Sequence, residues 1–288
     1  MFIKSWADEY DSDMENDFTK NKSTCNQTHI NSKNKDNENY NKIYKFSDKI
    51  CSRRCSLNYN LFTIVENSEY SCLMPWYVYQ VNNCLDEIYK EINLNKFKIN
   101  KIVDAGANIG VDSINFLYNF PNSQLISFEI DNKTYKALCK NLLEFNNITN
   151  LNSIKDLENS ENKVQAYNKD FLLNLDKIIN ADIVFIDAPW GGKIYKDKKS
   201  VSIYLQPENH YYNIYNYDES KNIISITKTI LQNKYNVKSV ILKVPYNYEF
   251  KNLENEIKKL DKQLNITYKN IYKGNSSYIA FVLIFIYI

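Results

Sequence analysis

The residues best suited to chemistry lie in one short segment of this chain. It reads Asp187-Ala188-Pro189-Trp190-Gly191-Gly192 and directly follows the apolar run at 182–186. A carboxylate, a proline and a flat aromatic ring in this order suit a planar base that carries an exocyclic amino group. The carboxylate can hold the amine, and the aromatic ring can stack on the face of the base.

Glycine is rare in the chain and unevenly placed. Of the five glycines, Gly191 and Gly192 form one pair, and Gly106 and Gly110 form another just after the strand-like run 101–104. Each pair comes directly past the end of an apolar strand, which is where open α/β sheets bind ligands. Because glycine lets the backbone approach a ligand closely, this distribution indicates two ligand-contacting turns.

Length and charge limit the class of protein. With 288 residues the chain can form one sizeable α/β domain plus an extension. A net charge of +2 provides no overall basic field, so any contact with RNA has to be local. Six cysteines without an apolar amino-terminal secretion signal indicate a reducing intracellular compartment, cytoplasm or nucleus. The apolar run 278–288 is shorter than the about 20 residues that a spanning helix needs, so we expect no membrane association.

The amino-terminal part differs in composition from the rest. Residues 1–56 are rich in Asn, Lys, Asp and Ser, which predicts a disordered polar tail before a folded domain over 57–288. The tail holds Cys25, His29, Cys51 and Cys55, which could form a zinc site. Because their spacing departs from that of zinc fingers, we expect unpaired cysteines and no metal.

Hydrophobic periodicity predicts alternating strands and helices from residue 57 onward. We expect helices at 77–92, 133–145, 222–232 and 249–260, and a further helical stretch after Gly110. The expected strands are 101–105, 124–130, 163–168, 182–186, 237–244, 264–271 and 277–286. Helices between strands imply a mostly parallel sheet, whereas the short turn at Gly274-Asn275 makes the last strand antiparallel. The predicted fold class is therefore α/β with a mostly parallel seven-stranded sheet.

Several motifs resemble those of known methyltransferases. The run Asp104-Ala105-Gly106-Ala107-Asn108-Ile109-Gly110 resembles the first S-adenosylmethionine motif of class I methyltransferases, and residues 112–116 resemble its continuation in trimethylguanosine synthases. Residues 187–195 are similar to the Ser-Pro-Pro-Trp-Gly-Gly-Pro-x-Tyr signature of those synthases, and closer still to the form in RNA methylases of large DNA viruses. The run 240–245, Val-Ile-Leu-Lys-Val-Pro, is also similar to the viral branch. The resemblance covers residues 70–286.

This resemblance implies a fold, a cofactor and a reaction. The fold is the Rossmann-like class I arrangement with helices on both faces of the sheet, and the cofactor is S-adenosylmethionine. The partner is RNA, and the methyl group goes to the exocyclic N2 of guanine in a 7-methylguanosine cap. Two positions depart from the family: Asn108 replaces a glycine, and Ala188 replaces a proline. The family's aromatic segment ahead of the domain is not recognisable, and we do not equate Pro75-Trp76-Tyr77 with it.

The cofactor-binding residues are expected at the ends of the first three strands. The resemblance implies that Asp104, Gly106, Asn108 and Gly110 form the turn at the methionine end of the cofactor, with Gly110 allowing close packing of helix on strand. Glu129 is expected to accept hydrogen bonds from the ribose hydroxyls.

Two further carboxylates carry alternatives that the sequence leaves open. Asp131 either substitutes for Glu129 or caps the helix that follows. Asp170, with Phe171, either binds the adenine or caps a helix.

The substrate residues are expected in the segment that follows the fourth strand. Asp187 and the carbonyl of Ala188 would orient the amine, whose lone pair is delocalised into the ring, and Pro189 would stiffen the loop. The nitrogen becomes acidic once methylated, so its proton can leave to Asp187 or to water. Trp190 would stack on the cationic 7-methylguanine, a cation–π gain of about 0.5 to 2 kcal/mol. The alternative is a tryptophan packed in the core.

Basic residues follow this segment directly. Lys193, Lys196, Lys198 and Lys199, interleaved with Tyr195, either hold the cap phosphates or RNA backbone, or form a solvated face. Lys243 is a weaker candidate of the same kind. Two rival functions remain open: an adenine-N6 methyltransferase, because Asp-x-Pro-Trp also resembles the motif of those enzymes, and a catalytically silent subunit that binds RNA.

Overall fold

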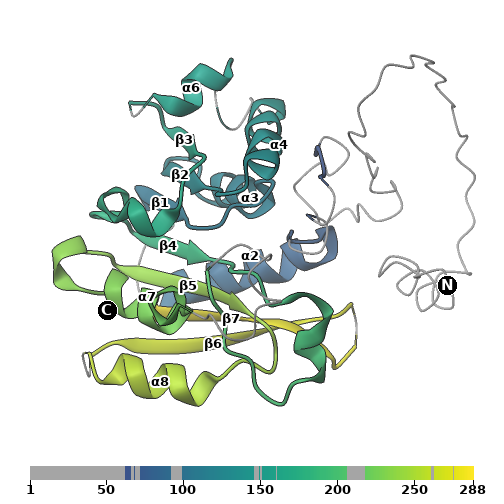
Figure 1. Ribbon diagram of the computed structural model, residues 1–288, viewed down its shortest axis with the longest axis vertical. Coiled ribbons are helices and arrows are strands. Elements are labelled where there is room, and N and C mark those ends of the chain that lie inside the picture. The colour runs from purple at the N-terminus through teal and green to yellow at the C-terminus, as the bar shows by residue number, and fades with distance from the viewer. Residues whose placement is uncertain are drawn as a thin grey trace, which may run out of the picture. The chain divides into compact units, whose positions relative to one another are not determined.

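A twisted β-sheet organises the part of the chain that the computed structural model describes (Figure 1). The described residues are 62–65, 68, 72–91, 99–145, 149, 151–159, 161–205, 218–260, 263–274 and 276–288. The tail predicted for residues 1–56, including Cys25, His29, Cys51 and Cys55, lies outside them.

The sheet has seven strands in the order β3-β2-β1-β4-β5-β7-β6. The strands are β1 Lys101–Asp104, β2 Gln124–Phe128, β3 Val164–Tyr167, β4 Ile183–Ile186, β5 Ser239–Val244, β6 Asn265–Tyr272 and β7 Ile279–Tyr287. The first five are parallel, and β7 is antiparallel to both β5 and β6. This order and direction define the Rossmann-like class I methyltransferase fold, which confirms the predicted fold class.

The helices agree with the predicted ones to within a few residues at each end. They are α2 Pro75–Glu91, α3 Val111–Asn119, α4 Asn132–Glu144, α6 Ile154–Glu158, α7 Ile223–Ile230 and α8 Phe250–Lys258. The short 3-10 helices are η4 Phe171–Leu173, η5 Leu175–Ile178, η6 Gly192–Asp197, η8 Glu219–Lys221 and η9 Asn233–Tyr235. The sequence did not predict α6, because five residues are too few to show a helical period. Within the described ranges, no helix combines the length and the apolar composition that crossing a bilayer requires.

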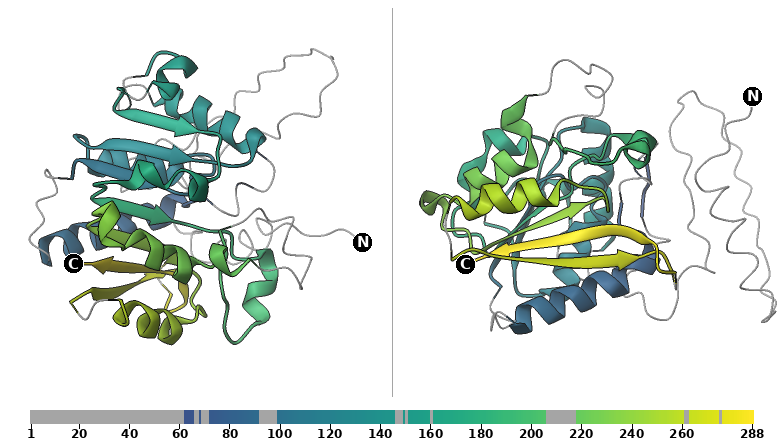
Figure 2. Two further views of the ribbon diagram at one scale, coloured as in Figure 1. Left: turned by 60° about the vertical axis from the view of Figure 1, so that its left-hand side comes forward. Right: turned by 90° about the horizontal axis from the view of Figure 1, so that it is seen from below.

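Helices cover both faces of the sheet, as predicted (Figure 2). Successive strand residues point to opposite faces, so Ile102 packs in one core cluster and Val103 in the other. The first cluster includes buried side chains of α2, α3 and α4, and the second those of α7 and α8. Strands β1, β4 and β5 are buried toward both faces, which explains why consecutive rather than alternating residues are apolar, as in Ile183–Ile186 and in Val240-Ile241-Leu242.

A buried amide joins the segment ahead of α2 to the rest of the domain. The side chain of Asn141, in α4, donates to the carbonyls of Ile109 at 2.7 Å and Thr63 at 3.0 Å. Its Oδ1 accepts from the backbone N–H of Thr63 at 2.6 Å. The Phe62 ring lies 4.9 Å from that of Phe145, between centroids. Residues 62–65 are therefore attached both to α4 and to the turn that follows β1.

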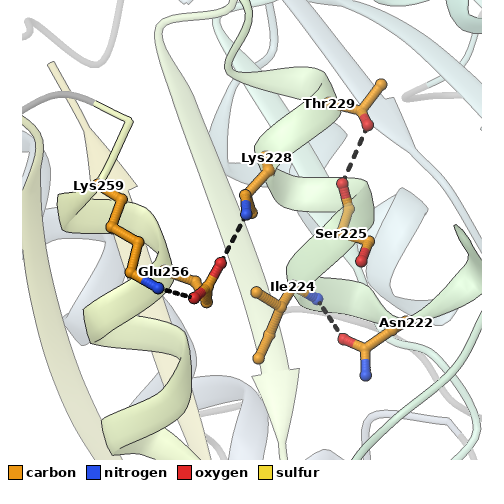
Figure 3. Close-up of polar contacts among 7 residues, drawn as sticks. All are labelled: Asn222, Ile224, Ser225, Lys228, Thr229, Glu256 and Lys259. Carbon is orange, nitrogen blue, oxygen red and sulfur yellow. Dashed lines mark hydrogen bonds and ion pairs between the residues drawn. The ribbon is translucent and has the colours of Figure 1, made fainter. Parts of the chain in front are cut away.

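On the other face, polar contacts connect α7 to α8 (Figure 3). The side chain of Asn222 accepts from the Ile224 N–H at 2.9 Å and so caps α7. Glu256 of α8 accepts from Lys228 at 2.6 Å and also pairs with Lys259. Because exposed ion pairs contribute little, the burial of apolar side chains from the two helices provides most of their packing energy.

Candidate functional site

The two predicted ligand-contacting turns meet at one place in the sheet. Strand β1 lies between β2 and β4, so the connections after β1 and β4 lead to opposite sides of the strand order, and the carboxyl ends of these strands are the switch point where open α/β sheets bind ligands in a crevice. A methyl group on Gly106 would lie 3.6 Å from the carbonyl oxygen of Asp187 and 3.5 Å from the Leu205 side chain. The structure thus brings the turn after β1 and the segment after β4 into contact.

Asp104 ends β1 as a completely buried carboxylate. Its Oδ2 accepts from the Ser113 hydroxyl at 2.6 Å, and Ser113 lies 2.9 Å from the hydroxyl of Ser127. Its Oδ1 has no hydrogen-bond partner among the described residues. Burial raises the pKa of Asp104 to about 8, against the opposing effect of the Ser113 hydrogen bond. The carboxylate is therefore suited to a ligand that brings a donor and a positive charge.

Asn108, which replaces the family's glycine, takes the left-handed conformation that asparagine tolerates. Its φ is 50°, and its N–H donates to Glu129 Oε2 at 3.0 Å. The replacement is thus accommodated without backbone strain of the kind that a branched residue would cause. Its Oδ1 is buried without a hydrogen-bond partner among the described residues, as is Oδ1 of Asp104.

Gly110 has a φ of 90°, in the left-handed region that favours glycine, and a methyl group there would lie 2.6 Å from the Leu138 side chain. Leu138 belongs to α4, so this glycine allows α4 to approach the turn after β1. The predicted packing of helix on strand at Gly110 stays a prediction beside this contact.

The carboxylates that follow β2 have separate partners. Glu129 accepts from the N–H groups of Asn108 at 3.0 Å and Asp131 at 2.8 Å. Burial raises the pKa of Glu129 to about 7, although both hydrogen bonds oppose the shift. Asp131 caps α4 by accepting from the backbone N–H and the hydroxyl of Thr134, both at 2.8 Å. The helix-cap alternative for Asp131 is therefore observed, and Glu129 alone contacts the turn after β1.

After β3, Asp170 caps the short helix η4, which is one of its two predicted alternatives. Its Oδ1 accepts from the Leu172 N–H at 2.9 Å, and its Oδ2 lies 3.9 Å from the Lys221 ammonium. Phe171 is buried, with its ring edge-on to that of Phe128 at 5.6 Å. Asp170 also borders a cavity of about 480 Å³, which is lined by Asp170, Leu172, Leu173, Leu175, Asp218, Ser220, Lys221, Ile226 and Thr229.

Asp187 is paired with a buried lysine that the sequence did not assign to it. Oδ2 of Asp187 lies 2.6 Å from Nζ of Lys243, and Oδ2 of Asp112 lies 3.3 Å from the same nitrogen. The side chain of Asp187 is 11 % exposed, that of Lys243 is 6 % exposed and that of Asp112 is 13 % exposed. Lys243 is therefore not placed to hold phosphates, and that prediction is wrong. A lysine inside the run Val-Ile-Leu-Lys-Val was the available signal, because a buried charge needs a partner.

The pKa values of this buried group reflect its charges. Burial raises the pKa of Asp187 to about 6, with Lys243 opposing the shift and Asp112 adding to it. Burial lowers the pKa of Lys243, but the carboxylates of Asp112 and Asp187 outweigh this effect and raise it above its usual value. Lys243 is therefore charged throughout the pH range in which Asp187 titrates.

Trp190 is anchored by its edge and is only partly buried. Its indole N–H donates to the carbonyl of Lys243 at 3.3 Å. The ring lies edge-on to Tyr195 at 5.4 Å and tilted against Phe281 at 6.5 Å, between centroids. Phe281 is in turn edge-on to Tyr77, in the first turn of α2, at 5.3 Å. The sequence identified neither Phe281 nor Tyr77, because only the fold brings β7 and α2 beside this segment.

The rest of the segment is shaped by its backbone. Ala188 is buried, and Pro189 is half-buried. Gly191 and Gly192 have φ values of 87° and 64°, in the left-handed region that favours glycine, and they turn the chain into η6.

The basic turn η6 is held by a residue that the sequence did not single out. The Asn247 side chain donates to the carbonyls of Tyr195 at 2.8 Å and Lys198 at 2.7 Å. Lys196, Lys198 and Lys199 are exposed, while the side chain of Lys193 lies outside the described residues. These lysines remain predicted RNA contacts.

The polar groups at these strand ends are hydrogen-bond acceptors of the kind that an S-adenosylmethionine molecule would need. Within the described ranges, no group of three His, Cys, Asp or Glu side chains is placed to hold a metal ion. The unpartnered oxygens of Asp104 and Asn108, together with Glu129, can accept from ammonium and hydroxyl donors at the crevice. S-adenosylmethionine carries both kinds of donor.

Comparisons with known proteins do not define a family for this chain. No protein-family model matches the chain, and no curated protein matches it. Among solved structures, a human methyltransferase 10 domain containing protein aligns with a TM-score of 0.46 and 12 % identity, over 73 % of this chain and 81 % of that one. The METTL16 MTase domain aligns with a TM-score of 0.46 and 15 % identity, over 75 % and 69 %. A protein described as an rRNA-methylase from Clostridium thermocellum aligns with a TM-score of 0.41 and 15 % identity, over 70 % and 94 %.

Proposed function

We propose that this chain is an S-adenosylmethionine-dependent RNA methyltransferase that acts on the exocyclic N2 of guanine, in a 7-methylguanosine cap. The observation that carries the proposal is the contact between the two turns at the switch point of the sheet. There, Gly106 and the Asp187 carbonyl are neighbours, so a methyl donor bound at the first turn would lie beside an acceptor base bound at the second. The resemblance of residues 187–195 to the trimethylguanosine synthase signature supports the choice of base.

The cofactor side of the crevice is formed by the first three strand ends. When bound, S-adenosylmethionine supplies an electrophilic methyl group. The free Oδ1 of Asp104 would accept from its ammonium, and Glu129, held by the Asn108 and Asp131 N–H groups, would accept from the ribose hydroxyls. Asp170, which borders the cavity after β3, would contact the adenine together with Phe171, in addition to capping η4.

The substrate side is formed by the segment after β4. Asp187 and the Ala188 carbonyl would orient the amine so that its nitrogen lone pair points toward the methyl group, which offsets part of its low nucleophilicity. Asp187 would then take the proton that the methylated nitrogen releases. Trp190 would stack on the base, with Lys193, Tyr195 and Lys196 contacting the cap phosphates or the RNA backbone.

The test is a methylation assay that reads out the product. The protein is incubated with labelled S-adenosylmethionine and RNA that is uncapped, capped or 7-methyl-capped, and the methylated nucleoside is identified after digestion. We expect label on guanine N2 of the 7-methyl-capped RNA. Asp187→Asn should lower turnover by about 10²- to 10⁴-fold, the usual contribution of a positioned acid or base. Asp176→Asn, an exposed aspartate on η5, is the matched control that should behave as wild type.

Other outcomes separate the rival functions. Label on adenine N6 would replace the guanine proposal with an adenine-N6 methyltransferase. S-adenosylmethionine binding or RNA binding without any transfer would favour a silent subunit. The replacement of glycine by Asn108 does not favour that alternative, because its left-handed conformation suits an asparagine.

A further inference from the structure

Lys243 lies between two carboxylates from different parts of the chain. Asp187 follows β4, Asp112 is in the first turn of α3, and Lys243 is in β5. The lysine nitrogen is 2.6 Å from Asp187 Oδ2 and 3.3 Å from Asp112 Oδ2. Because strand residues alternate, Lys243 points to the same face as Ile241, the face that α3 covers. The sheet therefore presents this cation to both carboxylates at once.

Burying these three charges lowers the stability of the fold, so a functional role would explain why they lie together. Three charges that are each less than one-seventh exposed lose most of their hydration, and a single cation cannot neutralise two carboxylates. The carbonyl of Lys243 also accepts the Trp190 indole N–H at 3.3 Å. One strand residue thus contacts both the carboxylate and the aromatic ring to which the proposed function assigns the base.

We propose that Lys243 and Asp112 are positioning residues for Asp187. Lys243 holds Oδ2 of Asp187 and keeps the carboxylate ionised, which leaves Oδ1 to accept from the substrate amine. Asp112 balances the charge of Lys243 whenever Asp187 becomes neutral. The inference deepens the proposed function and rests on it.

The proton balance shows why two carboxylates are useful here. As the new N–C bond forms, the S–C bond of the donor breaks and sulfur keeps the electron pair, so the positive charge passes to the amine nitrogen. That nitrogen then releases its proton to Asp187, which becomes neutral. Lys243 remains paired with Asp112 at this point, so no buried ammonium is left alone. Asp187 later passes the proton to water, and the ion pair with Lys243 is restored.

The groups that face this pair come from three elements and from the segment ahead of α2. Lys243 and Asp112 face Asp187 from β5 and α3, Asp104 lies near it at the end of β1, and Cys72, ahead of α2, lies near Lys243. Lys243 lowers the pKa of Asp187, whereas Asp112 raises it. Removing Lys243 should therefore raise the pKa of Asp187, and removing Asp112 should lower it. If Lys243 and Asp112 acted only through packing, replacing them would not shift the titration of Asp187 in opposite directions.

The experiment measures this titration directly, in the full chain without cofactor. Carbon-13 NMR of aspartate carboxyl groups is recorded against pH, and the Asp187 signal is assigned by its loss in Asp187→Asn. We expect the midpoint to move to higher pH in Lys243→Met and to lower pH in Asp112→Asn. The acidic limb of kcat against pH should move in the same two directions. At neutral pH, kcat of Lys243→Met should fall by roughly 10- to 100-fold, part of the contribution of a positioned base, with KM for RNA unchanged.

The outcomes separate the inference from the function on which it rests. Unchanged midpoints in both variants, with methylation intact, would overturn the inference alone. Shifted midpoints in a protein that methylates none of the RNAs would overturn the proposed function alone. If Lys243→Met does not fold, Asp112→Asn decides, because it keeps the shape of the side chain and leaves Lys243 paired with Asp187. Asp176→Asn is again the matched control.

Discussion

The two halves of the candidate site treat buried carboxylates differently. On the cofactor half, Asp104 and Glu129 receive hydrogen bonds from hydroxyl and backbone N–H groups, and no ion pair reaches them from the described residues. On the substrate half, Asp187 has a lysine at 2.6 Å. The pKa values reflect this difference, since burial raises the pKa of all three carboxylates, and only at Asp187 does a lysine ammonium oppose the shift.

The difference shows what each half needs from a ligand. Carboxylates without a cation are stabilised by a ligand that brings positive charge and donors, as S-adenosylmethionine does. A carboxylate that already has its cation can accept a neutral amine without a further charge. This contrast supports the proposed assignment of cofactor and base to the two halves, and each prediction below changes one half while the other serves as the reference.

The largest effect is expected for Trp190→Ala in the substrate half. Loss of the stacking surface should abolish methyl transfer and the preference for 7-methylated caps, while S-adenosylmethionine affinity stays unchanged. Because the ring is only partly buried, the stability loss should stay below the about 3 to 5 kcal/mol typical of a fully buried tryptophan. Urea unfolding and the affinity for cap analogues measure both quantities.

Trp190→Phe is the matched control for that variant, because it keeps a ring and removes the N–H that bonds to Lys243. It should retain most of the cap preference. A Trp190→Ala protein that is folded and still distinguishes 7-methylguanosine from guanosine would contradict the cap proposal, and methylation of another base would then be favoured.

A smaller effect is expected for Glu129→Ala in the cofactor half. Loss of charge-assisted hydrogen bonds to the ribose should weaken S-adenosylmethionine binding by about 1.5 to 3 kcal/mol, as calorimetry can measure. Asp131→Ala is the control, because it removes a helix cap and should cost about 1 kcal/mol of stability without changing the affinity. If the two variants exchanged these effects, the ribose contact would belong to Asp131.

The pH dependence of stability tests Asp104. A carboxylate whose folded pKa of about 8 exceeds its unfolded value stabilises the fold most below about pH 4, and this contribution is lost as pH rises through about 8. The free energy of unfolding should therefore fall with rising pH across this window, and less steeply in Asp104→Asn. Urea unfolding at several pH values gives the slopes. Equal slopes in the wild type and the variant would mean that Asp104 is not held neutral.

The smallest effect is expected at the basic turn η6. If Lys196 contacts a phosphate, Lys196→Ala should weaken RNA binding slightly at all sequences and reduce the slope of log affinity against log salt by about 0.7 to 0.9. Lys234→Ala, an exposed lysine in η9, is the control. Salt slopes that are identical in the two variants would assign Lys196 to the solvated face.

Much of the fold could be predicted from the sequence because its signals are local. Apolar runs such as 182–186 are buried toward both faces, and rare glycines mark the turns after β1 and β4. The short helix α6 escaped prediction because it lacks a repeated apolar face. At Asp131 and Asp170 the sequence left two alternatives each, and the observed caps depend on backbone geometry that composition does not reveal.

The electrostatic partners within the site could not be predicted, because they are far apart in the sequence. The sequence assigned Asp112 only to the continuation of the first motif, and Lys243 lies 131 positions later in the chain. Only the packing of α3 on the sheet brings these two side chains together. The same holds for Phe281, which packs against Trp190 from the last strand, and for Tyr77, which packs against Phe281 from the helix ahead of the first strand. The types of residue indicated the chemistry, whereas the topology of the fold determined which residues lie together in the site.

The buried amide of Asn141 also has a practical consequence for choosing fragments of this protein. The backbone of Thr63 donates to Oδ1 of Asn141 and accepts from its side-chain N–H. A fragment that starts after residue 65 would therefore leave these groups of Asn141 without those partners in the interior. An unsatisfied buried amide costs about 1 to 3 kcal/mol for each lost partner group, a large part of a typical domain's stability. A fragment intended for expression or crystallisation should therefore start ahead of Phe62, although the first strand of the sheet begins only at Lys101.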